Sequence, residues 1–174
     1  AMIRKIHLAK CLQENDWAPV EKDLNARPVE NVTGNSSHTQ IEEILKKYGV
    51  LAHEVQLWGT GKPLREFLWS EEMADACVFV MEQVNFSDLK GTHKEVRNCH
   101  INIGTGKEIS IHDLAMLIKD RVGYKGTITF DASKPDGTMR KLTDVSKLNA
   151  LGWKHTVEVE EGVERLYNWY KFSN

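Results

Sequence analysis

The segment from residue 73 to residue 84 most constrains how this chain folds, because it predicts a helix that is apolar almost all round. Ser70 is the predicted N-cap, and Glu71 and Glu72 lie in the first turn, where the helix dipole favours acidic side chains. Most later positions are apolar: Met73, Ala74, Ala76, Cys77, Val78, Phe79, Val80, Met81 and Val84. Such a helix needs cover on several sides. We expect a chain of 174 residues to supply only part of it.

The remaining pattern predicts one small α/β domain of the α+β kind over residues 1–174, mostly helical with a few short strands. Helices are expected over 1–12, 41–48, 111–122 and 144–151, and over a last stretch with Val159, Val163, Leu166 and Tyr170 as its core stripe. Strands are expected over 54–58, 99–103 and 127–130. Residues 13–40 are polar and turn-rich and predict at most short helices. The first helix lacks a capping residue before it, which suggests a chain cut from something longer.

Composition excludes several classes of function. The net charge of −2 supplies no long-range field for nucleic acid or an anionic membrane. No apolar run approaches the roughly 20 residues of a membrane span, and no signal-peptide pattern opens the chain. The three cysteines are few and far apart, as expected for reduced thiols in a cytoplasmic protein.

No motif in the chain indicates a catalytic centre, a metal site or a bound dinucleotide. The glycine turns at 59–62 and 104–107 fail the phosphate-loop pattern, and neither matches the G-x-G-x-x-G turn of dinucleotide-binding proteins. The seven histidines lack metal-ligand spacing, and there is no nucleophile elbow. We therefore predict no catalytic, cofactor-binding or metal-binding residue in this chain.

A set of cationic and aromatic residues in predicted loops remains. Trp58 and Arg65 bracket the first glycine turn, and the other members of the set are Arg4, Lys5, Lys134, Arg140 and Lys141. Cationic groups from separate loops suit a diphosphate, and an indole face suits a nucleobase. On spacing alone the alternative is favoured, in which the cations are solvated and Trp58 belongs to the core.

Two sequence runs resemble the GDP-L-fucose synthase family of extended short-chain dehydrogenases. Residues 58–74 read WGTGKPLREFLWSEEMA, and residues 131–141 read DASKPDGTMRK. INIGTG at residues 101–106 is shared by many extended short-chain dehydrogenases. The similarity runs in order over residues 1–12 and roughly 55–170. Trp69 stands where the family commonly has His, and residues 13–53 are longer than in compact relatives, as an added lid or an oligomer contact.

The resemblance implies the C-terminal, substrate-binding part of an NADP-dependent epimerase/reductase. That family converts GDP-4-keto-6-deoxy-D-mannose to GDP-L-fucose, with NADP(H) and the catalytic groups held by an N-terminal Rossmann domain that is absent here. The isolated chain is therefore expected to be inactive. Residues 66–84 are expected to pack on the missing domain, and the full-length enzyme is expected to be a homodimer.

The resemblance also assigns substrate-binding positions. Trp58 and Arg65 match positions that contact the substrate, and Lys141 matches a basic position near the diphosphate. Lys5 stands where the family often has Arg, and Thr127 stands where relatives can have Arg. Two alternatives stay open: a stand-alone module that binds a nucleotide-sugar or a protein, and a part of another nucleotide-sugar epimerase or dehydratase.

Overall fold

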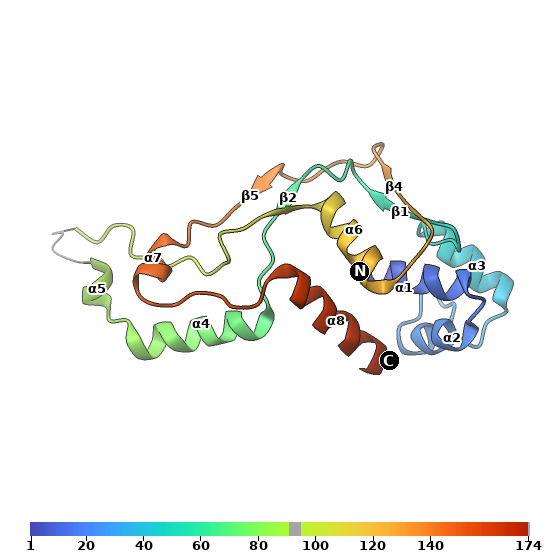
Figure 1. Ribbon diagram of the computed structural model, residues 1–174, viewed down its shortest axis with the longest axis horizontal. Coiled ribbons are helices and arrows are strands. Elements are labelled where there is room, and N and C mark those ends of the chain that lie inside the picture. The colour runs from blue at the N-terminus through green and yellow to red at the C-terminus, as the bar shows by residue number, and fades with distance from the viewer. Residues whose placement is uncertain (91–94, 174) are drawn as a thin grey trace. The chain divides into compact units, whose positions relative to one another are not determined.

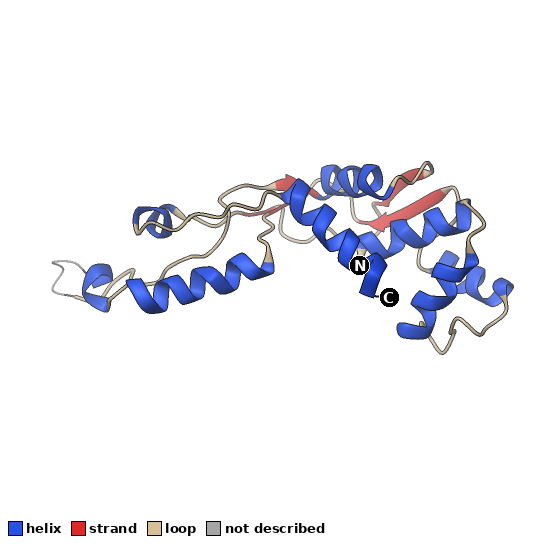
Figure 2. Cartoon of the chain, turned by 60° about the horizontal axis from the view of Figure 1, so that its bottom comes forward, coloured by secondary structure: helices blue, strands red, loops and turns tan. Residues whose placement is uncertain are grey.

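The computed structural model describes residues 1–90 and 95–173 and divides the chain into two compact units. Unit 1 comprises residues 1–63, 110–139 and 163–174, and unit 2 comprises residues 64–109 and 140–162. Helices outnumber the strands, which are short (Figure 2). The expected mixed α/β composition, mostly helical, is thereby confirmed. Among the described residues, no helix combines the length and the apolar character needed to cross a membrane.

Unit 1 is built from helices around a pair of parallel strands (Figure 1). Its helices are α1 (Met2–Gln13), α2 (Trp17–Ala26), α3 (His38–Lys47), α6 (Ile111–Val122) and most of α8 (Val159–Ser173). Strands β1 (Glu54–Trp58) and β4 (Thr127–Asp131) pair in parallel, with Val55 opposite Ile128. Helix α1 packs against α2, α6 and β1. The core side chains of this unit include Ile6, Val20, Leu24, Ile41, Val55 and Ala115, each 0% exposed.

Local sequence explains where several helices of unit 1 begin and end. The Ser110 hydroxyl accepts a hydrogen bond from the Asp113 amide and caps α6, as its sequence pattern predicts. Gly123 ends that helix at φ +77°, a conformation that glycine adopts at little cost. Ser37 and Gln40 form a complete capping box that starts α3 earlier than the apolar spacing predicts. Helix α1 has no side-chain cap, as expected.

The polar stretch between α1 and β1 is part of the unit 1 core. Asp23 of α2 is only 1% exposed, yet it is ionisable. Its carboxylate accepts hydrogen bonds from Arg4 Nε and from the Tyr170 hydroxyl, both at 2.7 Å. Arg27 Nη1 lies 3.6 Å from it. One buried carboxylate therefore joins three helices, α1, α2 and α8.

Unit 2 contains β2 (Leu64–Arg65), β5 (Arg140–Lys141), α4 (Ser70–Gln83), α5 (Phe86–Lys90) and α7 (Ser146–Ala150). The strand order is β3-β2-β5, with β3 at Ile109–Ser110. Buried Ala76, Leu148 and Trp153 form its core, with Leu68, Phe79, Val80, Ile101 and Ile103 packed against them. The Trp153 indole donates to Asp75 Oδ2 at 2.7 Å and ties the core to α4.

Three local predictions need correction. Residues 99–103 form no strand, because no other described strand pairs with them; Ile101 and Ile103 instead pack on the core of unit 2. Helix α4 begins at Ser70 itself, with Trp69 as N-cap and no side-chain cap. On α8, Leu166 is exposed, whereas its neighbour Tyr167 is buried with Val163 and Tyr170.

Candidate functional site

The exposed end of the β1–β4 pair carries one group of candidate site residues, in unit 1. Because the strands are parallel and Trp58 lies opposite Asp131, both chains leave the sheet at the same edge. The glycine turn at 59–62 follows β1, and the loop 131–139 follows β4. In open parallel sheets, ligands bind outside the carboxyl ends of the strands.

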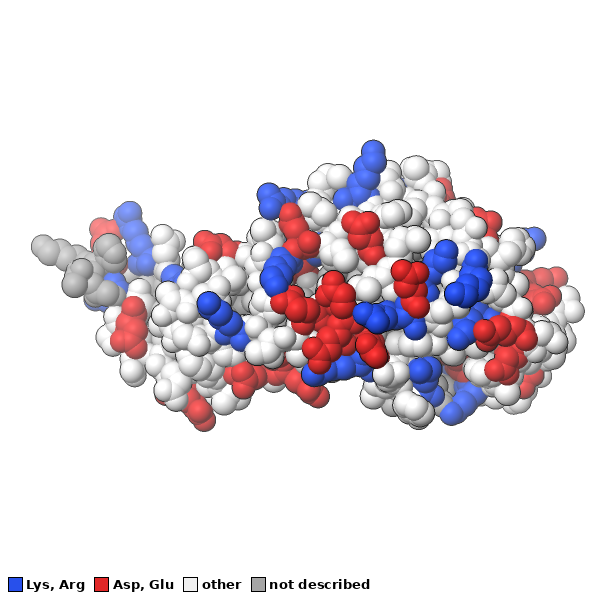
Figure 3. Space-filling model, viewed as in Figure 1, with Lys and Arg blue, Asp and Glu red and all other residues white. Residues whose placement is uncertain are grey.

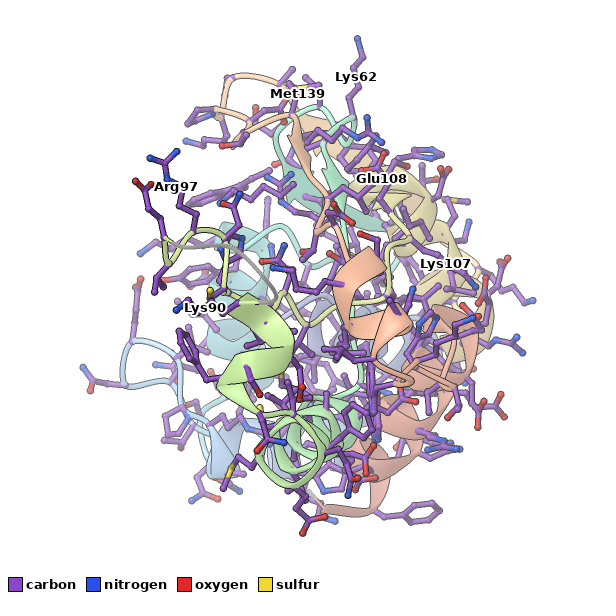
Figure 4. All side chains as sticks on the ribbon, turned by 90° about the vertical axis from the view of Figure 1, so that its left-hand side faces the viewer. Lys62, Lys90, Arg97, Lys107, Glu108 and Met139 are labelled. Carbon is purple, nitrogen blue, oxygen red and sulfur yellow. The ribbon has the colours of Figure 1, made fainter. Side chains whose placement is uncertain are left out.

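Trp58 lies at this edge as an exposed platform. Its side chain is 71% exposed, so the alternative that Trp58 belongs to the core is wrong. The Lys134 ammonium lies over the indole, 5.6 Å from the ring centroid, within the range of a cation–π contact. Lys62 of the glycine turn extends away from the chain (Figure 4). Lys134 belongs to the cationic set of the sequence, although the resemblance assigns it no substrate contact.

Arg65 and Lys141 form a separate candidate group, in unit 2. They are Cα partners in the parallel pairing of β2 with β5. The Arg65 guanidinium donates to the Leu64 carbonyl at 2.6 Å. The neighbouring Arg140 is paired with Glu108, at 2.8 Å between Nε and Oε1 (Glu108 is labelled in Figure 4). Like charges placed opposite one another in a sheet are destabilising. A bound anion between them would offset that cost.

Glu66 fixes the segment that carries Arg65. Its Oε1 accepts from the backbone amides of Thr105 and Gly106, the latter at 2.6 Å, and its Oε2 accepts from the Thr143 amide at 3.1 Å. A Cβ at Gly104 would meet Glu66 Oε1 at 2.5 Å, so the glycine permits the close approach. Burial alone would raise the pKa of Glu66, but the hydrogen bonds from Thr143, Gly106 and Thr105 outweigh it and lower the pKa.

This lowered pKa predicts a pH-dependent stability. A carboxyl whose folded pKa lies below its unfolded value stabilises the fold above the unfolded value, and loses that contribution as the pH falls through the folded pKa. We expect Glu66→Gln to cost about 2 kcal/mol at pH 7, the scale of hydrogen bonds to a charged group. The difference from wild type should shrink below about pH 4. Urea unfolding at both pH values measures it, with exposed Glu43→Gln as control. An equal difference at both pH values would contradict the assignment.

Lys5 is held by two backbone carbonyls. Its ammonium donates to the Tyr48 carbonyl at 2.6 Å and to the Gln56 carbonyl at 3.4 Å. It therefore joins the C-terminal end of α3 to β1, and partial burial lowers its pKa.

Thr127 is exposed at the start of β4, opposite Glu54, whereas Trp58 lies at the other end of the strand pair. The structure thus brings Arg65 and Lys141 together and does not bring Thr127 beside Trp58.

A cleft of about 420 Å³ in unit 2 has the wrong charge for a diphosphate. Its ionisable lining residues are Lys107, Glu108, Glu158 and Glu160. The single cation, Lys107, is already paired with Glu158, and Glu108 is paired with Arg140. On the face shown in Figure 3, acidic and basic side chains are intermixed rather than segregated by sign. The cation pair on β2 and β5 thus suits an anionic ligand better than this cleft does.

Comparison with known proteins identifies the family. Residues 27–104 match the model of the NAD dependent epimerase/dehydratase family. GDP-L-fucose synthase 1 of Arabidopsis thaliana is 47% identical over 119 residues, which cover 68% of this chain and 33% of that protein. The chain spans about a third of the length of that relative.

Solved structures match over nearly the whole chain. A GDP-6-OMe-4-keto-L-xylo-heptose reductase from C. jejuni superposes with a TM-score of 0.89 at 39% identity, covering 100% of this chain and 47% of that one. MlghC, a GDP-mannoheptose C4 reductase from Campylobacter jejuni with NADP bound, superposes with a TM-score of 0.81 at 37% identity, covering 98% and 45%. The chain is thus a GDP-L-fucose synthase-like member of the NAD-dependent epimerase/dehydratase family of extended short-chain dehydrogenases.

Proposed function

We propose that this chain binds a GDP-sugar, as the substrate-binding part of an NADP-dependent epimerase/reductase that converts GDP-4-keto-6-deoxy-D-mannose to GDP-L-fucose. The observation that carries the proposal is the placement of Arg65 directly opposite Lys141. A guanidinium binds phosphate oxygens through a planar fork, and an ammonium adds a second point of charge. In this proposal both contact the diphosphate. Trp58 is proposed as a contact for the base on the resemblance and on the exposure of its indole. Lys5 and Thr127 are proposed as further substrate contacts on the resemblance alone.

The role of these residues is positioning. Binding energy from the nucleotide, which does not react, holds the sugar in the geometry that the reaction needs. The sequence contains no G-x-G-x-x-G turn, the pattern typical of dinucleotide-binding domains. NADP(H) would therefore be held by another part of the full-length protein, and this chain alone would not catalyse the reaction.

A graded ligand series tests the diphosphate contact. Titration calorimetry of this chain with guanosine, GMP and GDP should show affinity rising with each phosphate. Lys141→Ala should remove most of the gain from GMP to GDP, whereas Lys154→Ala, another exposed lysine of unit 2, should leave it intact. Equal affinity for GMP and GDP in the wild-type chain would contradict the assignment of Arg65 and Lys141 to the diphosphate.

A second candidate is the reduction of a different GDP-keto-sugar. The C. jejuni heptose reductase structure covers 100% of this chain with a TM-score of 0.89, whereas the GDP-L-fucose synthetase structure from Naegleria fowleri covers 72% with a TM-score of 0.57. Competing GDP-4-keto-6-deoxy-D-mannose against a GDP-4-keto-heptose in the full-length enzyme separates the two. The larger kcat/KM identifies the substrate.

The exposed face of α4 supports a further domain as partner. Ala76 is the one buried residue of this helix, and Met73, Val78 and Met81 are 41%, 50% and 82% exposed. With Ala74 and Cys77 they follow helical spacing along one face. Within the described residues, this face of the helix is exposed. We propose that the Rossmann domain of the full-length protein covers it.

This face predicts self-association of the isolated chain. Exposed contiguous apolar surface drives association in water. We expect the chain to form oligomers in sedimentation experiments at tens of micromolar. A dissociation constant in this range corresponds to a binding free energy of about 6–7 kcal/mol. Val78→Lys/Met81→Lys should shift it to monomer. Phe172→Lys serves as control. Phe172 lies on α8, and its side chain is as exposed as that of Met81. If the control dissociates the oligomers and the double variant does not, the α4 face is not the contact.

A further inference from the structure

Two short stretches of unit 1 contact one another at two points. Trp58 and Thr60 flank Gly59, and Lys134 and Asp136 flank Pro135. The first residues of the two stretches make the cation–π contact, with Lys134 Nζ 5.6 Å from the indole centroid. The third residues make the second contact, where the Asp136 carboxylate accepts from the Thr60 amide at 2.8 Å and from the Thr60 hydroxyl at 2.6 Å. We call this second contact the Thr60–Asp136 latch.

The residues between the paired positions suit this arrangement. Gly59 has φ +83°, and a Cβ at this position would meet Asp136 Oδ1 at 2.3 Å, so both its backbone and its lack of a side chain are required. Pro135 fixes its own φ and confines Lys134 to extended conformations. The backbone between the ring contact and the latch is therefore restricted on both sides.

The bases of both loops are also held. The Gly59 amide donates to the Asp131 carbonyl at 3.0 Å, and the Lys134 amide donates to the same carbonyl at 3.1 Å. Asp131 Oδ1 accepts from the Ser133 amide at 3.0 Å. Lys134 thus lies between a fixed turn and the latch. Opening the latch removes the side-chain contact that holds the middle of the loop, between β4 and β5.

We propose that Asp136 is a positioning residue for the ligand: through the Thr60–Asp136 latch it holds Lys134 over the edge of Trp58, so that a nucleotide stacked on the indole meets the ammonium at its phosphate side. This role rests on the proposed GDP-sugar function. Asp136 does not contact the ligand itself. Its effect is exerted through Trp58 and Lys134. The cost of removing Asp136 should therefore depend on whether Trp58 is present.

A double-mutant cycle with GDP as the ligand tests the latch. Titration calorimetry of the full chain should give about a tenfold weaker Kd for Asp136→Ala, equivalent to about 1.4 kcal/mol. In the Trp58→Ala background the same change should cost less than about twofold, because residues that act through one another are not additive. Thr60→Val should weaken binding, and Thr60→Ser should restore it. The control is Asp88→Asn, a carboxylate that accepts one backbone amide, from Asn85, at 2.8 Å.

The outcomes separate the latch from the proposed function. Equal costs of Asp136→Ala in both backgrounds would make Asp136 merely structural and overturn the latch. Absence of GDP binding by the wild-type chain would contradict the proposed function. In that case amide hydrogen exchange and NMR of Asp136→Ala still test the latch. Loss of protection at the Thr60 amide together with a shifted Trp58 indole resonance supports the latch, and unchanged signals overturn it.

Discussion

Replacing Arg65 by alanine in the full-length enzyme is expected to raise the substrate KM well above tenfold. The guanidinium is proposed to bind the diphosphate through two parallel hydrogen bonds, and charge-assisted bonds of this kind are worth about 1.5–3 kcal/mol each. In sequence Arg65 lies between Leu64 and Glu66, and the hydrogen bonds of Glu66 hold its backbone in place. The lost interaction should therefore reduce ligand affinity without disrupting the local fold.

Two matched variants sharpen the prediction. Arg65→Lys keeps the charge but loses the fork, so we expect an intermediate KM. Arg97→Ala removes an arginine of the same unit whose side chain is 79% exposed and paired with Glu95, and its KM should equal that of wild type. Steady-state kinetics with the GDP-sugar measures all three. Unchanged kinetics in Arg65→Ala would remove Arg65 from the site.

Asp23→Ala is expected to destabilise unit 1 by about 3–5 kcal/mol, the cost of removing one partner of a buried ion pair. The carboxylate is 1% exposed and receives hydrogen bonds from Arg4 and Tyr170. Its loss leaves the Tyr170 hydroxyl without this partner in a buried position. Burial, followed by the hydrogen bond to Asp23, raises the pKa of Tyr170, so the tyrosine stays a neutral donor over the physiological range.

Urea unfolding of the purified chain measures this effect. Asp23→Asn, which keeps an acceptor but loses the charge, should cost less than Asp23→Ala. Asp16→Ala provides the control, since Asp16 is exposed and makes no side-chain cap at the start of α2. A loss below about 1 kcal/mol for Asp23→Ala would mean that the stretch from residue 13 to 53 contributes little to the stability of unit 1.

Features set by nearby residues were predictable from the sequence. Alternating apolar residues between turns predicted β1, and β-branched residues predicted β4. The Ser110–Asp113 cap was predicted because its two members are three residues apart. The capping box of Ser37 and Gln40 is the same kind of local signal. It lies within the polar stretch, so the apolar spacing alone predicts a later start for α3. Local chemistry thus predicts that these elements exist, whereas the starts of α3 and α4 differ from the predicted ones.

Features that depend on distant residues were not predictable in this way. The opposition of Arg65 and Lys141 requires β2 to pair with β5, which lies more than seventy residues further along the chain. The stretch 99–103 has the composition of a strand, but a strand needs a partner, and the described strands offer none. The hydrogen bonds of Asp136 to Thr60 are likewise invisible in the spacing. The resemblance thus predicted Trp58 and Arg65 as substrate contacts, and the sequence placed Lys134 in the cationic set, whereas nothing in the sequence singled out Asp136.

The central claim is that this chain recognises a GDP-sugar without its cofactor. Calorimetric titration of the chain with GDP, UDP and NADPH in parallel tests it most directly. We expect GDP to bind more tightly than UDP, the GDP signal to disappear in Arg65→Ala, and NADPH to give no signal. Tight binding of NADPH, or GDP binding that survives in Arg65→Ala, would contradict the account.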